Sequence, residues 1–350
     1  MYEYIFALIF FGNQILSLEP KNMFDRLLCL SVFMDNNIFW FIQDMLVKNV
    51  ADFKKVQELK NFKIKQDVSM KGAFMVSPIG FALNEQTAQD NEYMQMNQEV
   101  DEKLAIYQQM HLARVLTDFG IPVITFPGSE DSPDAVFPNN AFATNHNRRY
   151  IIGSMRYPNR QLETERRDIR KFFNNVLGYE EYVIEHHRAI AELTGVLVPD
   201  RGRNIGFVGM TERVDEEGAV ELDEGFQLDL TFQFDLAEGE YHTNVVMACL
   251  ASVGCVLHKD SFADPEVVKA IDDFYQGKIL YLSDEEKMAF CGNCISITER
   301  DVLFSKNAYN TLSTSSKKTL TNWGLDIHGV DVSELEKAGG SLRCMIGEIF

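Results

Sequence analysis

From residue 73 onward, short apolar runs alternate with stretches in which apolar residues recur every three or four positions. The first pattern predicts buried strands and the second predicts amphipathic helices. Predicted strands cover residues 74–76, 122–126, 150–153, 195–198, 205–208 and 244–247, and predicted helices cover residues 101–119, 160–177 and 264–276. Gly120 closes the first helix as a predicted C-cap. The repeated strand–helix–strand order predicts an α/β fold.

Residues 1–70 do not share this pattern. They hold one glycine, one proline, 8 Lys+Arg and 8 Asp+Glu, which leaves 33 − 8 = 25 basic and 52 − 8 = 44 acidic residues for residues 71–350. The apolar run at residues 5–11 has no preceding Lys or Arg and is too short to cross a bilayer, although a secretory signal is its alternative interpretation. We therefore predict an atypical N-terminal extension over residues 1–70, dispensable for activity, and a functional domain over residues 71–350.

Composition narrows the class of protein. The chain has 350 residues, 46% of them hydrophobic, and can bury a substantial core. Its net charge of −19 repels phosphates and anionic lipids, so we expect no nucleic-acid partner and no stable membrane insertion. Six cysteines are too sparse for a disulfide framework and predict reduced thiols in the cytoplasm. Whether the chain forms a homo-oligomer is left open.

Three separated residues suggest a thiol nucleophile. Cys344 lies in Gly-Gly-Ser-Leu-Arg-Cys-Met near the end of the chain, His242 lies in Tyr-His-Thr-Asn, and Glu192 lies in Ala-Glu-Leu-Thr-Gly. A thiolate can attack a planar carbon, an imidazole can move protons, and a carboxylate can fix the imidazole's orientation and tautomer. The alternative for Cys344 is a buried structural thiol.

A further segment, residues 131–144, places Asp134 before Ala-Val-Phe and follows it with Pro138 and two asparagines, Asn139 and Asn140. Taken alone, this segment is typical of a turn. Together with the cysteine and histidine segments it resembles the guanidine-group-modifying superfamily, which includes arginine deiminases, dimethylarginine dimethylaminohydrolases, amidinotransferases and citrulline hydrolases. The resemblance covers about residues 73–350. It implies a five-bladed α/β-propeller, the pentein fold, and a reaction without a metal or another cofactor.

The resemblance also implies roles for individual residues. Cys344 corresponds to the nucleophile and His242 to the general acid and base. Glu192 corresponds to the acid that holds the histidine, although Leu193 stands where a glycine is usual. Asp134 corresponds to the substrate-binding acid.

Two arginines complete the implied site. Arg213 corresponds to the arginine that binds the substrate's α-carboxylate, and Arg160 is a second candidate for that role. A guanidinium fork suits a carboxylate.

Two departures from the family predict the substrate. Asn140 and Asn244 stand where deiminases and dimethylarginine hydrolases carry aspartates that neutralise a cationic guanidinium. Losing that compensation costs several kcal/mol for a buried cation, whereas an amide can donate to and accept from a neutral ureido group. We therefore expect a small guanidino or ureido amino acid, with a ureido end such as that of citrulline favoured, or an arginine derivative whose charge Asp134 partly meets.

The sequence leaves three alternative functions open. An amidinotransferase would pass the same covalent intermediate to an amine instead of water. A thiol-redox protein would use Cys291 and Cys294, whose C-x-x-C spacing also suits zinc, but this motif lacks a second pair and we expect two buried thiols. A catalytically inactive member would act by binding. The remaining histidines show no metal-ligand spacing, so we predict no metal site.

Overall fold

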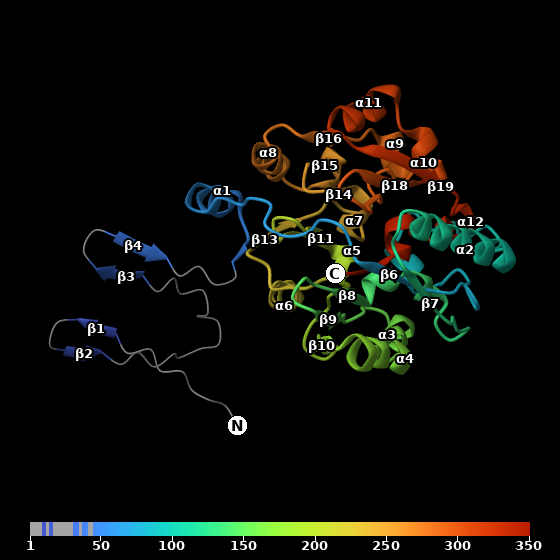
Figure 1. The fold of residues 1–350 in the computed structure, drawn as a ribbon, viewed down its shortest axis with the longest axis horizontal. Coiled ribbons are helices and arrows are strands. Elements are labelled where there is room, and N and C mark those ends of the chain that lie inside the picture. The colour runs from blue at the N-terminus through green and yellow to red at the C-terminus, as the bar shows by residue number, and fades with distance from the viewer. Residues whose placement is uncertain (1–8, 12–13, 17–30, 35–36, 41–44) are drawn as a thin grey trace. The chain divides into compact units, whose positions relative to one another are not determined.

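The computed structural model describes residues 9–11, 14–16, 31–34, 37–40 and 45–350. The chain divides into two compact units, Met1–Gln43 and Asp44–Phe350 (Figure 1). In the first unit, β1 (Ile9–Phe11) pairs antiparallel with β2 (Gln14–Leu16), and β3 (Ser31–Met34) pairs antiparallel with β4 (Asn37–Trp40). The predicted apolar run at residues 5–11 lies partly outside the described residues, and its last three residues form β1.

Five small sheets make up the second unit (Figure 1). In order along the chain they are β20 (Gly347–Ile349), β6 (Gly72–Val76) and β7 (Val123–Phe126); β8 (Phe142–Thr144), β9 (Arg149–Ile152) and β10 (Glu180–Val183); β11 (Leu197–Asp200), β12 (Ile205–Met210), β13 (Leu230–Asp235) and β5 (Leu46–Val47); β14 (Met247–Leu250), β15 (Gly254–Leu257) and β16 (Ile279–Tyr281); and β17 (Ile295–Ser296), β18 (Asp301–Ser305) and β19 (Asp326–Val330).

The five sheets repeat one pairing pattern. In each, the first strand named pairs antiparallel with the second, and the second pairs parallel with the third. The chain's last strand, β20, completes the sheet that β6 begins. The first strands also touch between sheets, since β8 contacts β20, and β14 contacts both β11 and β17. The repeat lies in the order and direction of strand pairing, and the amino-acid sequence shows no matching repeat.

Helices connect and flank the strands. Their bounds are α1 (Val50–Leu59), α2 (Glu102–Asp118), α3 (Pro158–Thr164), α4 (Arg167–Lys171), α5 (Leu193–Val196), α6 (Glu216–Phe226), α7 (Thr243–Val246), α8 (Pro265–Phe274), α9 (Asp284–Met288), α10 (Lys306–Thr311), α11 (Thr314–Asn322) and α12 (Ser333–Glu336). The predictions for α2 and α8 are confirmed, with Asp101 and Asp264 as N-caps that accept backbone N–H groups. The chain thus has a mixed α/β fold, as predicted.

Two predicted strands begin too early. Residues 195–196 and 244–246 belong to one-turn helices, α5 and α7, and the strands begin at Leu197 and Met247. The apolar pattern could not predict these two turns, because tertiary hydrogen bonds join them. Thr243 donates to the Val196 carbonyl, and Asn244 donates to the Thr194 carbonyl. These bonds tie the two turns to each other.

The predicted helix over residues 160–177 is interrupted. It consists of α3, α4 and a π-helical turn at Phe172–Leu177, with a break where Arg166 adopts an extended conformation. The Arg166 guanidinium donates to the Pro127 carbonyl at 2.9 Å, which fixes the break.

The segment from residue 45 to residue 70 packs within the second unit. Its strand β5 pairs with β13, and Phe53 of α1 is fully buried and stacks on Phe232 with ring centroids 4.1 Å apart. The structural division therefore falls after Gln43, whereas composition changes near residue 70. The two boundaries differ because composition depends on where glycine and proline become frequent, whereas packing depends on the burial of Phe53 within the second unit. That the extension over residues 1–70 is dispensable stays a prediction.

No helix in the described part of the chain combines the length and the apolar content that a bilayer crossing needs.

Candidate active site

Three predicted catalytic residues and one predicted substrate-binding residue, Asn140, occupy equivalent places in different sheets. Asn140 lies in the 3-10 turn η3 (Pro138–Asn140), just before β8, and Cys344 lies in η6 (Leu342–Met345), just before β20. Glu192 precedes α5 and β11, and His242 precedes α7 and β14. Because these four strands are the first strands of their sheets and touch one another in part, the fold gathers residues that are far apart in sequence.

One cavity receives most of the predicted residues. Its lining consists of Thr87, Asn91, Met94, Asp134, Phe137, Asn140, Arg160, Arg213, Tyr241, His242, Ala338, Gly340 and Cys344. Glu192 lies behind His242, and Asn244 lies against Cys344. The loop from Asn84 to Met94 supplies lining residues that sequence reasoning missed.

The orientation of His242 is set by Glu192. His242 Nε2 lies 2.9 Å from Glu192 Oε2, and both side chains are buried. Burial alone would raise the pKa of Glu192, but Arg213, the hydrogen bond to His242 and Arg160 hold the pKa well below its usual range. An ionised carboxylate only accepts hydrogen bonds, so Nε2 carries the hydrogen and Nδ1 keeps the lone pair.

The other imidazole nitrogen is available for chemistry. His242 Nδ1 is buried and has no hydrogen-bond partner among the described residues. Burial lowers the pKa of His242 despite the opposing effect of Glu192, which favours the neutral imidazole. Gly195 permits this packing, since a Cβ there would lie 2.8 Å from the His242 ring and 2.7 Å from Asn140 Nδ2. The site therefore presents a proton acceptor.

Both arginines of the cavity are held by carboxylates. Arg213 donates to Asp90 at 2.7 and 2.6 Å and to both oxygens of Glu192 at 3.2 and 3.1 Å, and its remaining N–H reaches the Thr87 carbonyl at 3.2 Å. All five N–H donors of this guanidinium are thus engaged.

Arg160 is engaged in the same way. It donates to Glu163 at 2.9 and 3.0 Å, to Asn140 Oδ1 at 3.0 Å and to Glu192 at 3.4 Å, and its last N–H points at the Phe137 carbonyl 3.5 Å away. Burial raises the pKa of Glu163 to about 7 even beside this cation. Sequence reasoning missed Glu163 and Asp90, although an acid three residues after Arg160 on a helix was a readable signal.

Two amides surround the Cys344 sulfur. Asn293 Nδ2 lies 3.3 Å and Asn244 Nδ2 lies 3.6 Å from Cys344 Sγ. Burial raises the pKa of the Cys344 thiol, and the two amides and the neighbouring Arg343 oppose that rise. Among the described residues no hydrogen bond joins the sulfur to His242, and the two side chains line the same cavity.

Asp134 presents an unpaired oxygen. Its Oδ2 accepts from Asn84 Nδ2 at 2.7 Å and from the Thr87 hydroxyl at 3.0 Å, whereas its buried Oδ1 has no partner. Burial raises the pKa of Asp134, against the effect of Arg160 and the two hydrogen bonds. Asp134 is one of the cavity-lining residues, and a buried oxygen without a partner among the described residues has an unused capacity to accept a hydrogen bond.

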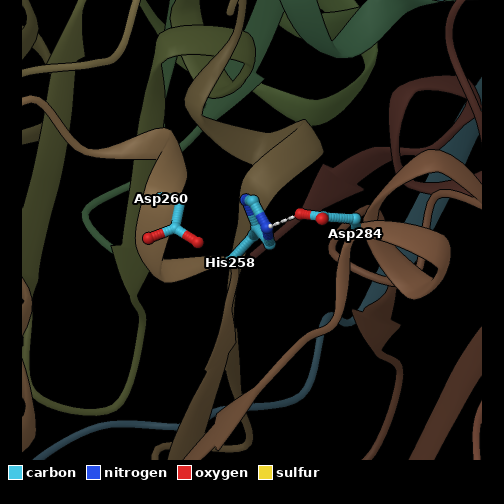
Figure 2. Close-up of side chains that lie close together, drawn as sticks. All are labelled: His258, Asp260 and Asp284. Atoms are coloured by element: carbon cyan, nitrogen blue, oxygen red, sulfur yellow. Dashed lines mark hydrogen bonds and ion pairs between the residues drawn. The ribbon is translucent and has the colours of Figure 1, made fainter.

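Sulfur and metal-ligand groups elsewhere have local partners. Cys291 donates to the Ala308 carbonyl, and burial raises the pKa of both Cys291 and Cys294. Figure 2 shows His258 between Asp260 and Asp284, the group of potential metal ligands found among the described residues. Both nitrogens of His258 are occupied, Nδ1 by the Ser261 hydroxyl at 2.8 Å and Nε2 by Asp284 at 2.9 Å. Neither nitrogen is free for an ion.

Sequence comparison places the chain beside known proteins. Residues 77–350 match the protein family described as "N,N dimethylarginine dimethylhydrolase, eukaryotic". The uncharacterized protein ZK1307.1 of Caenorhabditis elegans is 24% identical over 256 residues, covering 71% of this chain and 84% of that protein. The uncharacterized protein YkgA of Bacillus subtilis is 22% identical over 244 residues, covering 69% and 79%.

Solved structures share the fold. The N-terminal domain of ArgZ, a cyanobacterial arginine dihydrolase, solved with substrate in a cysteine-to-serine variant, superposes with a TM-score of 0.69 at 16% identity, over 79% of this chain and 97% of that one. This chain spans only 40% of full-length ArgZ. The Pseudomonas aeruginosa DDAH complexed with citrulline gives a TM-score of 0.62 at 21% identity, over 80% and 99%. The TM-scores establish a shared mixed α/β fold.

Proposed function

The chain belongs to the N,N dimethylarginine dimethylhydrolase family, and from that premise we propose that it hydrolyses a C–N bond in the guanidino or ureido end of an amino acid through a covalent intermediate on Cys344. The observation that carries the proposal is the cavity that Cys344 and His242 share, with His242 held through Nε2 by the buried, ionised Glu192. No metal or other cofactor is needed for these groups to act.

The first step is activation of the thiol. The raised pKa of Cys344 keeps it protonated at rest, and the free lone pair of His242 Nδ1 accepts this proton when substrate enters. Glu192 stabilises the imidazolium that forms, because it already holds the opposite nitrogen. The sulfur anion then adds to the planar carbon of the substrate.

The bonds then rearrange in two stages. For a ureido substrate the carbon–nitrogen bond to the terminal NH₂ breaks, and that nitrogen takes the electron pair and the His242 proton and leaves as ammonia. A thiocarbamate on Cys344 remains. Water gives one proton to His242 and adds to the same carbon, the carbon–sulfur bond breaks, and the sulfur recovers its proton. The product is a carbamic acid, which loses carbon dioxide. A guanidino substrate would pass through a thiouronium and yield a ureido product.

The charges of the cavity favour the ureido end. Its lining contains two guanidinium groups, Arg160 and Arg213, and one carboxyl group, Asp134. Burial raises the pKa of that carboxyl group and so favours its neutral form. Asn140 adds an amide where relatives carry an acid. A buried cationic guanidinium would find little compensation here, at a cost of several kcal/mol, whereas a neutral ureido group would not need any. Citrulline is the simplest substrate of this kind.

Arg160 and Arg213 act first as counter-ions of Glu192 in this proposal. Each donates to the Glu192 carboxylate, and each also pairs with a second acid, Glu163 for Arg160 and Asp90 for Arg213. A substrate α-carboxylate would bind Arg213 by displacing Asp90, which occupies the guanidinium fork. Asp134 Oδ1 would contact the substrate directly, since it has no protein partner. Asn244 would act at the Cys344 sulfur rather than on the substrate's far end.

We also infer that the five sheets are the blades of a propeller around this cavity. The repeated antiparallel-then-parallel pairing and the contacts between first strands of neighbouring sheets support this arrangement. The pairing of β20 with β6 would close the ring, as the last strand completes the first blade.

Ammonia release from citrulline and from arginine tests the proposal. Turnover of citrulline by the wild type, its loss in Cys344→Ser and its retention in the matched control Cys291→Ser are expected. Mass analysis of protein quenched during turnover should find an adduct on the Cys344 peptide. A strong preference for arginine with inert citrulline would refute the ureido substrate, and activity in Cys344→Ser would refute the nucleophile. A transferred product on adding glycine would instead indicate an amidinotransferase.

A further inference from the structure

The order of the strands draws a parallel between Asn293 and four of the predicted site residues. Asn140, Glu192, His242 and Cys344 each lie shortly before the first strand of one sheet. The remaining first strand is β17 (Ile295–Ser296), and the residue in the matching place is Asn293. Its Nδ2 lies 3.3 Å from the Cys344 sulfur.

Building on the proposed function, we propose that Asn293 is a catalytic residue that stabilises the sulfur anion of Cys344 by donating an N–H hydrogen bond to it. The C-x-x-C motif that contains Asn293 then contributes its amide to the reaction, and its two thiols are structural.

The backbone fixes which end of the Asn293 amide faces the sulfur. The Arg343 backbone N–H donates to Asn293 Oδ1 at 3.1 Å, and an N–H can only meet an acceptor. The Asn244 backbone carbonyl lies 2.9 Å from Asn293 Nδ2, and a carbonyl can only meet a donor. The carbonyl end of the amide therefore points to Arg343. Its NH₂ end must point to Asn244 and to the sulfur, so the contact with Cys344 is a donation.

Packing holds this amide in place. Asn293 is 1% exposed, and the preceding Gly292 lies so close to α7 that a Cβ would meet the Val245 carbonyl oxygen at 2.3 Å. Only glycine permits that approach, and the approach brings Asn293 against Asn244. Cys291, on the other side of Gly292, points to the Ala308 carbonyl instead of the cavity.

A donor at this position answers a specific physical need. A sulfur anion without water requires hydrogen bonds or positive charge to offset its burial. Asn244 Nδ2, at 3.6 Å, is the second amide donor, and Arg343 is the neighbouring cation. The other titratable and charged groups that line the same cavity as Cys344 are Asp134, Arg160, Arg213, Tyr241 and His242. Asn293 gives the shortest hydrogen bond to the sulfur from any described side chain.

The rate at which iodoacetamide alkylates Cys344 measures the proposed effect without requiring turnover. Cys344 is read by mass spectrometry of its own peptide, so other thiols do not contribute, and the rate is followed from neutral to alkaline pH. In Asn293→Asp the group facing the sulfur becomes a carboxylate oxygen of nearly the same shape. We expect the alkylation midpoint to rise by at least about one pH unit, which is about a tenfold lower rate at neutral pH. Asn293→Ser loses the reach to the sulfur and should shift in the same direction by less. Turnover should fall by about a hundredfold in Asn293→Asp.

Cys291→Ser is the matched control, because its hydroxyl can still donate to the Ala308 carbonyl and it lies two residues from Asn293. It should keep the wild-type alkylation profile. Thermal melting identifies the folded variants, and Asn293→Ser decides if Asn293→Asp does not fold. Wild-type alkylation profiles in the folded Asn293 variants would overturn the inference. If the Asn293 variants shift the alkylation profile but the wild type hydrolyses none of the tested substrates, the proposed function is refuted. The hydrogen bond from Asn293 to the sulfur is then still supported.

Discussion

Replacing Glu192 by glutamine should separate the chemistry of the site from its stability. Glu192 is fully buried and accepts from His242 at 2.9 Å, from Arg213 at 3.2 and 3.1 Å and from Arg160 at 3.4 Å. Glutamine has the same shape but no charge, and its NH₂ group is a donor. If that group faces His242 Nε2, the imidazole hydrogen must move to Nδ1. Nδ1 then cannot accept the Cys344 proton.

The expected loss of activity is large. In a serine protease triad, the equivalent acid-to-amide change costs about 10⁴-fold in kcat because it imposes the wrong tautomer. We expect about 10³- to 10⁴-fold for Glu192→Gln, since here too the imidazole nitrogen that must accept the proton would carry a hydrogen instead. The acid limb of kcat/KM should also move to lower pH, because Glu192 raises the pKa of His242 and glutamine cannot.

The loss of stability should be moderate. Breaking a buried ion pair costs about 3–5 kcal/mol, and the lower end applies because Arg160 keeps Glu163 and Arg213 keeps Asp90 as partners. The pKa of Glu192 is held below its ordinary value of 4.5, so its stabilisation is present above that pH and is lost as the pH falls through the lower folded value. The difference between wild type and Glu192→Gln in urea midpoint should therefore shrink in acid.

Glu163→Gln is the matched control for this test. Glu163 is also buried and bonds to Arg160 twice, but it does not touch His242. It should lose less stability than Glu192→Gln, because burial raises the pKa of Glu163 to about 7 and so already favours a neutral side chain near pH 7. It should also show a much smaller fall in kcat and an unmoved acid limb. The reasoning would be refuted if Glu192→Gln kept kcat within about tenfold of the wild type with an unchanged acid limb.

Three further predictions concern the substrate, the pH profile and the N-terminus. Asn140→Asp should raise kcat/KM for arginine relative to citrulline, because it adds an acid beside Arg160 in the cavity; an unchanged ratio in ammonia-release assays would contradict the charge argument. The acid limb of kcat/KM in the wild type should be centred below the ordinary histidine pKa of 6.5, because burial lowers the pKa of His242; a limb centred above that value would remove His242 as the base. Deletion of residues 1–43 should leave the melting temperature of the second unit unchanged, whereas deletion through residue 59 removes the buried Phe53 and should cost about 3–5 kcal/mol; equal melting temperatures for the two truncations would place Phe53 outside the core.

The sequence predicted the α/β fold because the helices and most strands carry local signals. The N-cap Asp101 and the apolar spacing of α2 are visible without a structure. The one-turn helices α5 and α7 are not, because hydrogen bonds between Thr243 and the Val196 carbonyl, distant in sequence, determine them. Local pattern thus failed at the two turns that follow Glu192 and His242.

The candidate site was partly predictable for a similar reason. Cys344, His242 and Glu192 lie in segments whose neighbours are informative, and the structure brings Cys344 and His242 to one cavity and Glu192 behind it. Asn293 was not predicted as a site residue, because it lies inside a C-x-x-C motif, whose spacing indicates redox or zinc chemistry of the two thiols. Asn293 precedes β17, as the other site residues precede the first strands of their own sheets. This correspondence depends on the strand order of the sheet β17–β18–β19, which only the structure shows.

The preference for a neutral substrate and the raised pKa of Asp134 have a common electrostatic cause. The buried acids Glu163 and Glu192, like Asp90, are each paired with a guanidinium, so these acids and arginines compensate one another within the protein. Asp134 is the only carboxyl group among the cavity-lining residues, and its burial favours the neutral acid. A cationic ligand would therefore have to ionise Asp134 to gain a counter-charge of its own. A ureido group avoids this cost, since its oxygen can accept from a protonated Asp134 and its NH₂ can donate to an ionised one.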